Sequence, residues 1–214
     1  MTNLEKKYWQ IAQKASYFLQ LSPFLKMVGI NGSLARHCIT KESDIDFIVI
    51  SEKGRIWTCR FFVTAIITVL GLKRHGKKVA GRICLNRFIT TESLVLFPYN
   101  EYHAKVYSLT VPTIDQNIYQ KFVSENCWMT NYTDTKKINP MLVKKNIFFK
   151  FISKILELIL NKNFGSIIEI FLKNYQIKKI KKHPLTINNK GLIIANDSML
   201  CFHPTSDVNL TKIG

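Results

Sequence analysis

Acidic residues are scarce in this chain. Asp and Glu number 14 against 31 Lys and Arg in 214 residues, so the formal net charge is +17 at pH 7. An excess of one sign this large indicates a polyanionic partner or substrate: a nucleic acid, a nucleotide or an acidic protein. The alternative is a lysine-rich composition with no partner behind it. Hydrophobic residues make up 47% of the chain, which excludes disorder over most of its length.

Paired cysteines are also lacking. The five cysteines are odd in number and widely spaced, with no Cys-x-x-Cys, and the five histidines are equally scattered. This pattern argues against a disulfide framework and against a structural zinc site. We therefore expect reduced, mostly buried thiols in a cytoplasmic protein.

Long hydrophobic segments are absent as well. The longest apolar run covers residues 61–72, which is too short to span a bilayer and is typical of a buried helix. The first 21 residues are too polar for the apolar core of a signal peptide. The sequence therefore predicts no membrane contact.

The few aspartates include a pair that stands out. Asp44 and Asp46 alternate with apolar residues, so they share one face of a predicted strand. Two adjacent carboxylates repel each other unless a cation lies between them, and a divalent metal is the usual solution. The preceding Gly32-Ser33 turn offers backbone N–H groups and a hydroxyl to a phosphate. The pattern predicts a site for a metal-bound nucleoside triphosphate; the alternative is a turn and a strand whose aspartates cap a neighbouring helix.

Gly32-Ser33 followed by Asp44-Ile45-Asp46 resembles the signature of the DNA polymerase β-type nucleotidyltransferase superfamily. Within that superfamily it is most similar to the bacterial minimal nucleotidyltransferase branch, whose members are usually much shorter. The similarity covers residues 28–50. It implies an α+β nucleotidyltransferase fold, in which a mixed β-sheet is flanked by helices.

The resemblance also implies an activity. A nucleoside monophosphate would pass from a nucleoside triphosphate to an RNA, protein or small-molecule acceptor, with Mg²⁺ or Mn²⁺ as cofactor. Asp44 and Asp46 are the implied catalytic residues and metal ligands. The predicted nucleotide-binding residues are Gly32, Ser33, Arg36, Lys41 and Ser43.

Active members of the family carry a third carboxylate on a later strand. In this chain the corresponding position is Asn86, whose amide oxygen can bind a metal but brings no charge and is a poor base. Glu92 and Glu101 lie further along and are candidates to replace it. Otherwise the acceptor needs little activation, or the protein binds nucleotide or RNA without catalysis, or it is a structural protein with a relic site.

Apolar spacing predicts the main secondary structure. Helices are expected over 4–21, 34–39 and 56–72, and strands over 24–30, 45–50, 82–89 and 94–97. The basic loop 73–78 is expected to return to the edge that carries Asp44 if the second and third strands are parallel. Residues 100–140 show no regular pattern.

The C-terminal part is expected to be helical and basic. Helices over 144–160 and 166–182 are predicted to form an antiparallel hairpin, followed by strands over 185–187, 192–195 and 199–203. We place a nucleotidyltransferase-like domain at 1–140 and a hairpin with a short β tail at 141–214. Residues Lys144–Lys182 contain ten lysines and two glutamates, which predicts contact with an RNA phosphate backbone.

Overall fold

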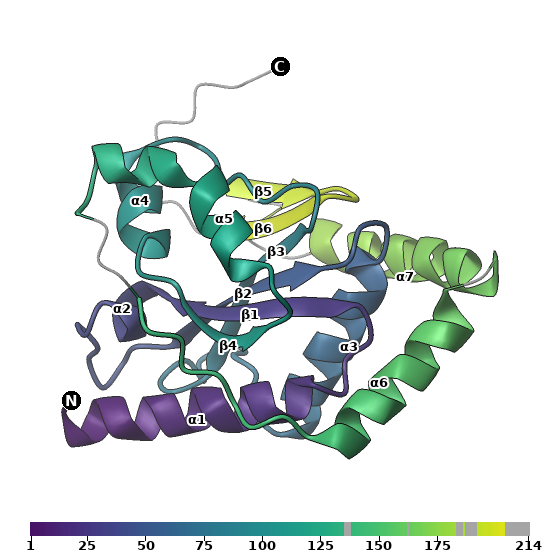
Figure 1. Cartoon of the computed structure of the whole chain (residues 1–214), viewed down its shortest axis with the longest axis horizontal. Coiled ribbons are helices and arrows are strands. Elements are labelled where there is room, and N and C mark those ends of the chain that lie inside the picture. The colour runs from purple at the N-terminus through teal and green to yellow at the C-terminus, as the bar shows by residue number, and fades with distance from the viewer. Residues whose placement is uncertain (135–137, 162, 183–185, 187–191, 204–214) are drawn as a thin grey trace.

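The computed structural model describes residues 1–134, 138–161, 163–182, 186 and 192–203 (Figure 1). These residues form a six-stranded sheet in the order β4-β1-β2-β3-β6-β5, with helices on both faces. The β2–β3 pair is parallel and the other pairs are antiparallel, so the sheet is mixed, as expected. The strands are β1 Leu25–Asn31, β2 Ile45–Ser51, β3 Ile83–Thr90, β4 Val111–Asp115, β5 Leu192–Ala195 and β6 Met199–His203.

The helices divide between two hydrophobic cores. The core on one face of the sheet includes α1, α3 and α7, and the core on the other face includes α4, α5 and η1. The helices are α1 Asn3–Leu19, α2 Gly32–Ala35, α3 Ile56–Val69, α4 Glu101–Tyr107, α5 Tyr119–Glu125, the 3₁₀ helix η1 Cys127–Asn131, α6 Ile147–Leu160 and α7 Asn163–Lys181. None of the helices among the described residues is long and apolar enough to cross a membrane.

Strand β2 explains why Asp46 is conspicuous. Ile45 and Phe47 contribute to the core that contains α1 and α3, whereas Ile48 and Ile50 contribute to the opposite core. A strand covered on both faces reads as a continuous apolar run. Asp46 interrupts that run on the side of the sheet that carries α4. It is the second residue of β2, so its carboxylate lies at the end of the strand and not in the middle of the core.

The predicted strand over 94–97 is wrong. Leu94 and Leu96 are fully buried, which accounts for the apolar pattern, but their backbone pairs with a side chain instead of a strand. The amide of Asn126 accepts from the Leu96 N–H at 2.8 Å and donates to the Leu94 carbonyl at 2.8 Å. One buried amide therefore takes the place of a ladder partner.

The region without a predicted pattern, 100–140, supplies α4, β4, α5 and η1. Strand β4 is an edge strand of five residues that contains Pro112, opposite Gly29 of β1. Proline is depleted in central strands and tolerated at edges, so propensity gives little signal for β4.

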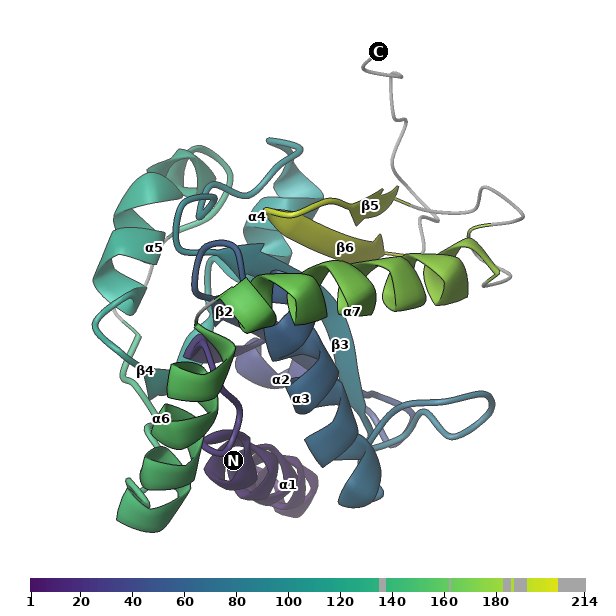
Figure 2. The same ribbon diagram turned by 90° about the vertical axis from the view of Figure 1, so that its right-hand side faces the viewer.

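Both predicted C-terminal helices are present, although α6 begins at Ile147 instead of residue 144 and α7 at Asn163 instead of residue 166. The predicted antiparallel hairpin is wrong. Figures 1 and 2 show α6 and α7 diverging from a corner, with α7 lying across α3. A Cβ on Gly165 would lie 1.6 Å from the Leu160 carbonyl oxygen, so only glycine permits this close turn between the helices.

Contacts between α7 and α3 hold the C-terminal part on the sheet. The Glu169 carboxylate accepts from the backbone N–H groups of Trp57 at 2.8 Å and Thr58 at 2.9 Å, in the first turn of α3. A carboxylate there accepts hydrogen bonds from N–H groups that have no partner within the helix, and its negative charge suits the N-terminal end of the helix dipole.

The predicted strands at 192–195 and 199–203 are confirmed, and β6 pairs with β3, so both extend the main sheet. The predicted strand over 185–187 lies outside the described residues except for Thr186.

Candidate metal and nucleotide site

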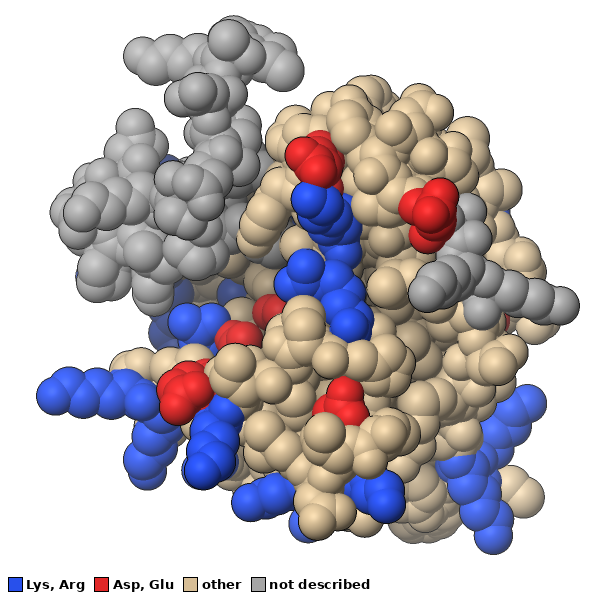
Figure 3. Space-filling view, turned by 90° about the vertical axis from the view of Figure 1, so that its left-hand side faces the viewer, with Lys and Arg blue, Asp and Glu red and all other residues tan. Residues whose placement is uncertain are grey.

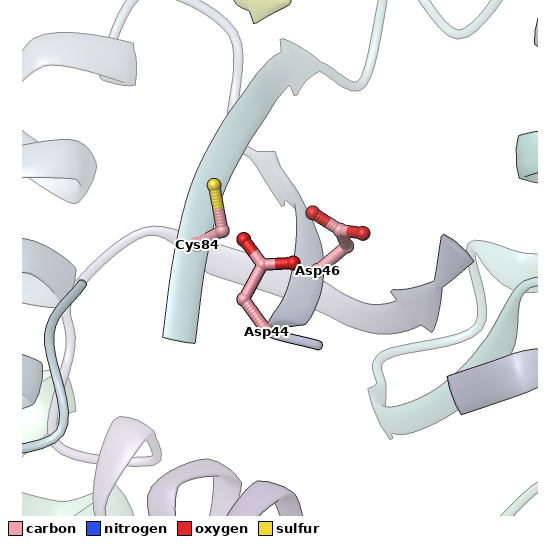
Figure 4. Close-up of side chains that lie close together, drawn as sticks. All are labelled: Asp44, Asp46 and Cys84. Atoms are coloured by element: carbon pink, nitrogen blue, oxygen red, sulfur yellow. The ribbon is translucent and has the colours of Figure 1, made fainter. Parts of the chain in front are cut away.

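The two aspartates and one cysteine converge at the start of β2 and β3 (Figure 4). Asp44 immediately precedes β2, Asp46 is its second residue, and Cys84 lies opposite Asp46 in the β2–β3 register. One carboxylate oxygen of each aspartate and the Cys84 Sγ lie within 4.8 Å of one another. The prediction that both carboxylates share one face is confirmed.

Gly32 is required by this arrangement for two reasons. Its φ of +67° falls in the left-handed region that favours glycine, and a Cβ there would lie 2.3 Å from Asp46 Oδ2. The backbone of the Gly32-Ser33 turn therefore lies directly against the Asp46 carboxylate. The two sequence motifs form one site.

The electrostatics of Asp46 favour a bound cation. Burial and, second, the neighbouring Asp44 carboxylate raise the pKa of Asp46 from 3.8 to about 7, although Arg74 and Arg36 counteract this. Asn86 Nδ2 donates to Asp46 Oδ1 at 2.7 Å. This amide offsets little of the repulsion because it carries no charge, whereas a divalent cation between the carboxylates would remove it.

The Asp44 carboxylate forms an ion pair with Arg74. Arg74 Nη1 donates to Asp44 Oδ2 at 2.6 Å and lies 3.6 Å from Cys84 Sγ. The loop is held at the sheet edge because the Arg74 N–H donates to the Ile83 carbonyl at 3.0 Å. The expectation that the basic loop returns to the Asp44 edge is confirmed. Burial and the two aspartates also raise the pKa of the Cys84 thiol to about 12.

Two buried amides beside Asp46 are only partly hydrogen-bonded. Asn31 pairs with Asp46 across the β1–β2 ladder, so both side chains are on the same face of the sheet. Asn31 is fully buried and neither Oδ1 nor Nδ2 has a hydrogen-bond partner; Asn86 Oδ1 also lacks one. Unsatisfied buried polar atoms are costly, so these three atoms are candidates to contact a ligand or a water molecule beside Asp46.

The remaining predicted nucleotide-binding residues divide into two groups. Ser33 follows Gly32, and Arg36 Nε donates to the Gly32 carbonyl at 3.3 Å, so both belong to the turn against Asp46. Ser43 Oγ instead accepts from the Thr40 N–H at 2.9 Å, and the Lys41 side chain is exposed. The described contacts bring neither Lys41 nor Ser43 side chain to the carboxylates.

Neither candidate replacement for the third carboxylate joins the cluster. Glu92 pairs with Lys53 at 2.7 Å and Glu101 with Lys105 at 2.5 Å, both at the surface. Asn86 therefore keeps the third position, next to Asp46.

Sequence reasoning missed Cys84, Arg74 and Asn31 as members of the site. Cys84 stands two residues before Asn86, so strand alternation gave a signal for it. Asn31 directly precedes the Gly-Ser turn. Arg74 gave no separate signal within a run of basic residues, because only the packing of the loop selects it.

Basic side chains are more prominent than acidic ones on the side of the molecule that carries α2. Figure 3 shows this side, with Lys and Arg in several groups and a few Asp and Glu between them. Burial and then the nearby cations Arg60 and Lys179 lower the pKa of Lys73. The basic loop therefore lies close to the C-terminal end of α7, where Lys178 and Lys181 follow the same helix.

Comparison of this chain with protein-family models, with curated proteins and with solved structures finds no match.

Proposed function

We propose that this chain is a nucleotidyltransferase of the DNA polymerase β type, which transfers a nucleoside monophosphate from a nucleoside triphosphate to an acceptor. One observation carries the proposal. The Gly32-Ser33 turn lies against Asp46, and Asp44 lies beside Asp46, which is the juxtaposition that the family resemblance implies for a metal-nucleotide site. Cys84 joins the two aspartates within 4.8 Å, and the resemblance does not imply it.

The donor set fits a divalent cation. Asp44 and Asp46 supply hard oxygen ligands that suit Mg²⁺ or Mn²⁺, and the Asn86 Oδ1 atom is available beside them. When bound, the cation neutralises charge on the triphosphate. Cys84 adds a softer donor, which favours Mn²⁺ over Mg²⁺ in this set.

The chain's own residues would bind and orient the triphosphate. Gly32 and Ser33 would contact the β- and γ-phosphates, and Arg36 would offset charge on the leaving pyrophosphate. Arg74 now donates a hydrogen bond to Asp44, and it would donate to a phosphate oxygen instead when the triphosphate binds. Its planar guanidinium suits phosphate binding. Correct placement of donor and acceptor would then supply most of the rate enhancement.

The acceptor chemistry follows from Asn86. Because an amide cannot take a proton from a hydroxyl, the site suits an acceptor that arrives already ionised, such as a phosphate or carboxylate. The basic loop beside Asp44 and the lysines of α7 near it suit a polyanion. Our proposed acceptor is therefore RNA that reacts through a terminal phosphate, which attacks the α-phosphorus as pyrophosphate leaves. A protein acceptor remains the alternative.

Asn86 also favours a second candidate function. Its Nδ2 donates to Asp46 in the place where active relatives carry an acid. A site that keeps metal and nucleotide but lacks this acid would act as a nucleotide-binding or RNA-binding module without catalysis.

Label transfer distinguishes the two functions. The protein would be incubated with Mg²⁺ or Mn²⁺, each α-labelled nucleoside triphosphate, and total RNA or cell lysate, beside an Asp44→Ala/Asp46→Ala control. Label in RNA or in one protein band, lost in the control, supports the transferase. Nucleotide binding without label supports the binding module, and no metal-dependent nucleotide binding contradicts both.

A further inference from the structure

The outer surfaces of α6 and α7 expose an unusual amount of apolar surface. Twenty large hydrophobic side chains are exposed in the described part of the chain, and eleven of them lie on these two helices. We call the eleven the α6–α7 apolar face: Ile147, Phe148, Phe151, Ile155, Leu158, Ile159, Phe164, Ile167, Ile170, Phe171 and Tyr175. So many exposed apolar side chains on two neighbouring helices mark a binding surface.

Polar contacts on the inner side fix the rotation of α6. Ser153 Oγ donates to the Ser22 carbonyl at 3.1 Å, and the Glu157 carboxylate accepts from the Phe24 N–H at 2.9 Å. Because these polar residues face the body of the protein, the apolar stripe of α6 must face outward. Ile147 is 84% exposed and Leu158 is 70% exposed.

The charges on the two helices are separated in the same way, except that Lys154 also pairs with Glu157 at 2.5 Å. Both glutamates, Glu157 and Glu169, accept hydrogen bonds from backbone N–H groups of the protein body. The exposed charged side chains are lysines: Lys150, Lys154, Lys178, Lys179 and Lys181. Apolar side chains flanked by lysines complement a surface that is apolar inside and anionic at its boundary.

A second copy of this chain fits the face poorly. It would bring the same lysines against these lysines, in a protein with a net charge of +17. Figure 2 shows α6 and α7 together on one side of the molecule, extending in different directions from their corner. A broad surface contacts both helices at once, whereas a single partner helix follows one direction.

We propose that the α6–α7 apolar face lies on the surface of an anionic lipid bilayer, with both helices in the interface and neither crossing it. In Figure 1 the two helices lie on the right and α2, which carries Gly32, lies on the left. The metal and nucleotide site would therefore stay open to water. This membrane contact does not require the proposed transferase activity, although the lysines at the C-terminal end of α7 take part in both proposals. It departs from the sequence-based expectation of no membrane contact.

Vesicle co-sedimentation tests the proposal with the full-length chain. The probes are vesicles of neutral phosphatidylcholine and vesicles that also contain anionic phosphatidylglycerol. Phe148→Ser/Phe151→Ser/Phe171→Ser removes apolar contact, and Val69→Ser is the control because Val69 is 88% exposed on α3. Lys150→Gln/Lys154→Gln removes two charges from the face, and Lys105→Gln/Lys121→Gln removes two from α4 and α5.

We expect the wild type to bind anionic vesicles and to bind neutral ones much less. The triple Phe variant should lose about a hundredfold or more in partitioning, because each lost ring removes interfacial burial. The Lys150→Gln/Lys154→Gln variant should lose about tenfold. The controls should bind as the wild type does, and circular dichroism should show the same helix content throughout.

Four results would overturn the proposal. The folded wild type does not sediment with anionic vesicles, or the triple Phe variant sediments as the wild type does. Alternatively, sedimentation velocity without lipid shows a dimer that the triple Phe variant loses, or a co-purifying protein or RNA is lost with the same variant. Nucleotide binding and label transfer should not change in any of these variants, so failure here leaves the proposed function standing.

Discussion

The two opposite sides of this molecule reverse the usual distribution of side chains. At the start of β2 a half-buried aspartate lies beside buried amides with unpaired polar atoms, whereas on α6 and α7 isoleucines and phenylalanines are exposed. Both arrangements cost folding free energy in the isolated chain. The comparison indicates that each side is adapted to something that the chain binds: a cation with an anionic nucleotide at one, an apolar and anionic surface at the other.

The largest expected effect separates the two sides by function. Asp46→Asn should lower metal-dependent label transfer about a thousandfold, since the cation supplies several kcal/mol of charge stabilisation. Vesicle binding should stay unchanged. Transfer rates and co-sedimentation on the same preparation check both; a variant that loses vesicle binding too would break the separation.

The same aspartate should make stability depend on pH and metal. Its pKa of about 7 lies above the ordinary 3.8, so the folded state binds the extra proton between these values. The stabilising contribution is complete below about pH 4 and is lost as the pH rises through about 7. Thermal unfolding without divalent cation should show this loss for the wild type and not for Asp46→Asn.

Mn²⁺ should restore the wild-type stability near neutral pH and leave Asp46→Asn unaffected. If the two proteins had the same dependence of stability on pH, the raised pKa of Asp46 beside Asp44 would be contradicted.

A smaller effect tests the contact between the two sequence motifs. Gly32→Ala should destabilise the fold by about 2–4 kcal/mol, from a left-handed φ and from contact with Asp46. Gly54→Ala is the matched control, because Gly54 has the same φ of +67° and nothing within 4 Å of its would-be Cβ. Urea unfolding measures both. Equal losses would show that the Asp46 contact does not matter.

The smallest expected effect concerns the attachment of the apolar face to the body. Glu169→Gln should cost about 1–2 kcal/mol, because a charged acceptor is lost from the first turn of α3. Glu125→Gln on α5 is the control and should change little, since its 3.6 Å ion pair with Lys121 is at the surface. Thermal unfolding of the two variants compares them, and a larger loss for Glu125→Gln would contradict this role for Glu169.

Much of the fold could be predicted from local pattern. The short apolar run of β2 follows from burial on both faces of the sheet, and the helical spacing of α3 and α6 follows from apolar side chains that share one face. The spacing of apolar residues predicts the type and length of a helix or strand, but it does not predict which part of the protein, if any, packs against its apolar face. Spacing alone therefore does not reveal that the apolar stripe of α6 faces outward, which the contacts of Glu157 and Ser153 with the body of the protein establish.

The site was predictable where chemistry and sequence position coincide. Gly32, Asp44 and Asp46 lie within fifteen residues of one another, and their roles depend on local geometry. Arg74 and Asn31 join them only through strand register and loop packing, which depend on distant residues. Short-range motifs therefore identified the acids, while the cation and the amides required the tertiary structure.

Mn²⁺ binding tests the central claim most directly. Electron paramagnetic resonance would count bound Mn²⁺ with a non-hydrolysable nucleoside triphosphate for the wild type, Asp46→Asn and Glu92→Gln. We expect nucleotide-dependent Mn²⁺ binding by the wild type and by Glu92→Gln, and its loss in Asp46→Asn. Equal binding by all three proteins, or by none, would contradict a metal and nucleotide site at Asp44 and Asp46.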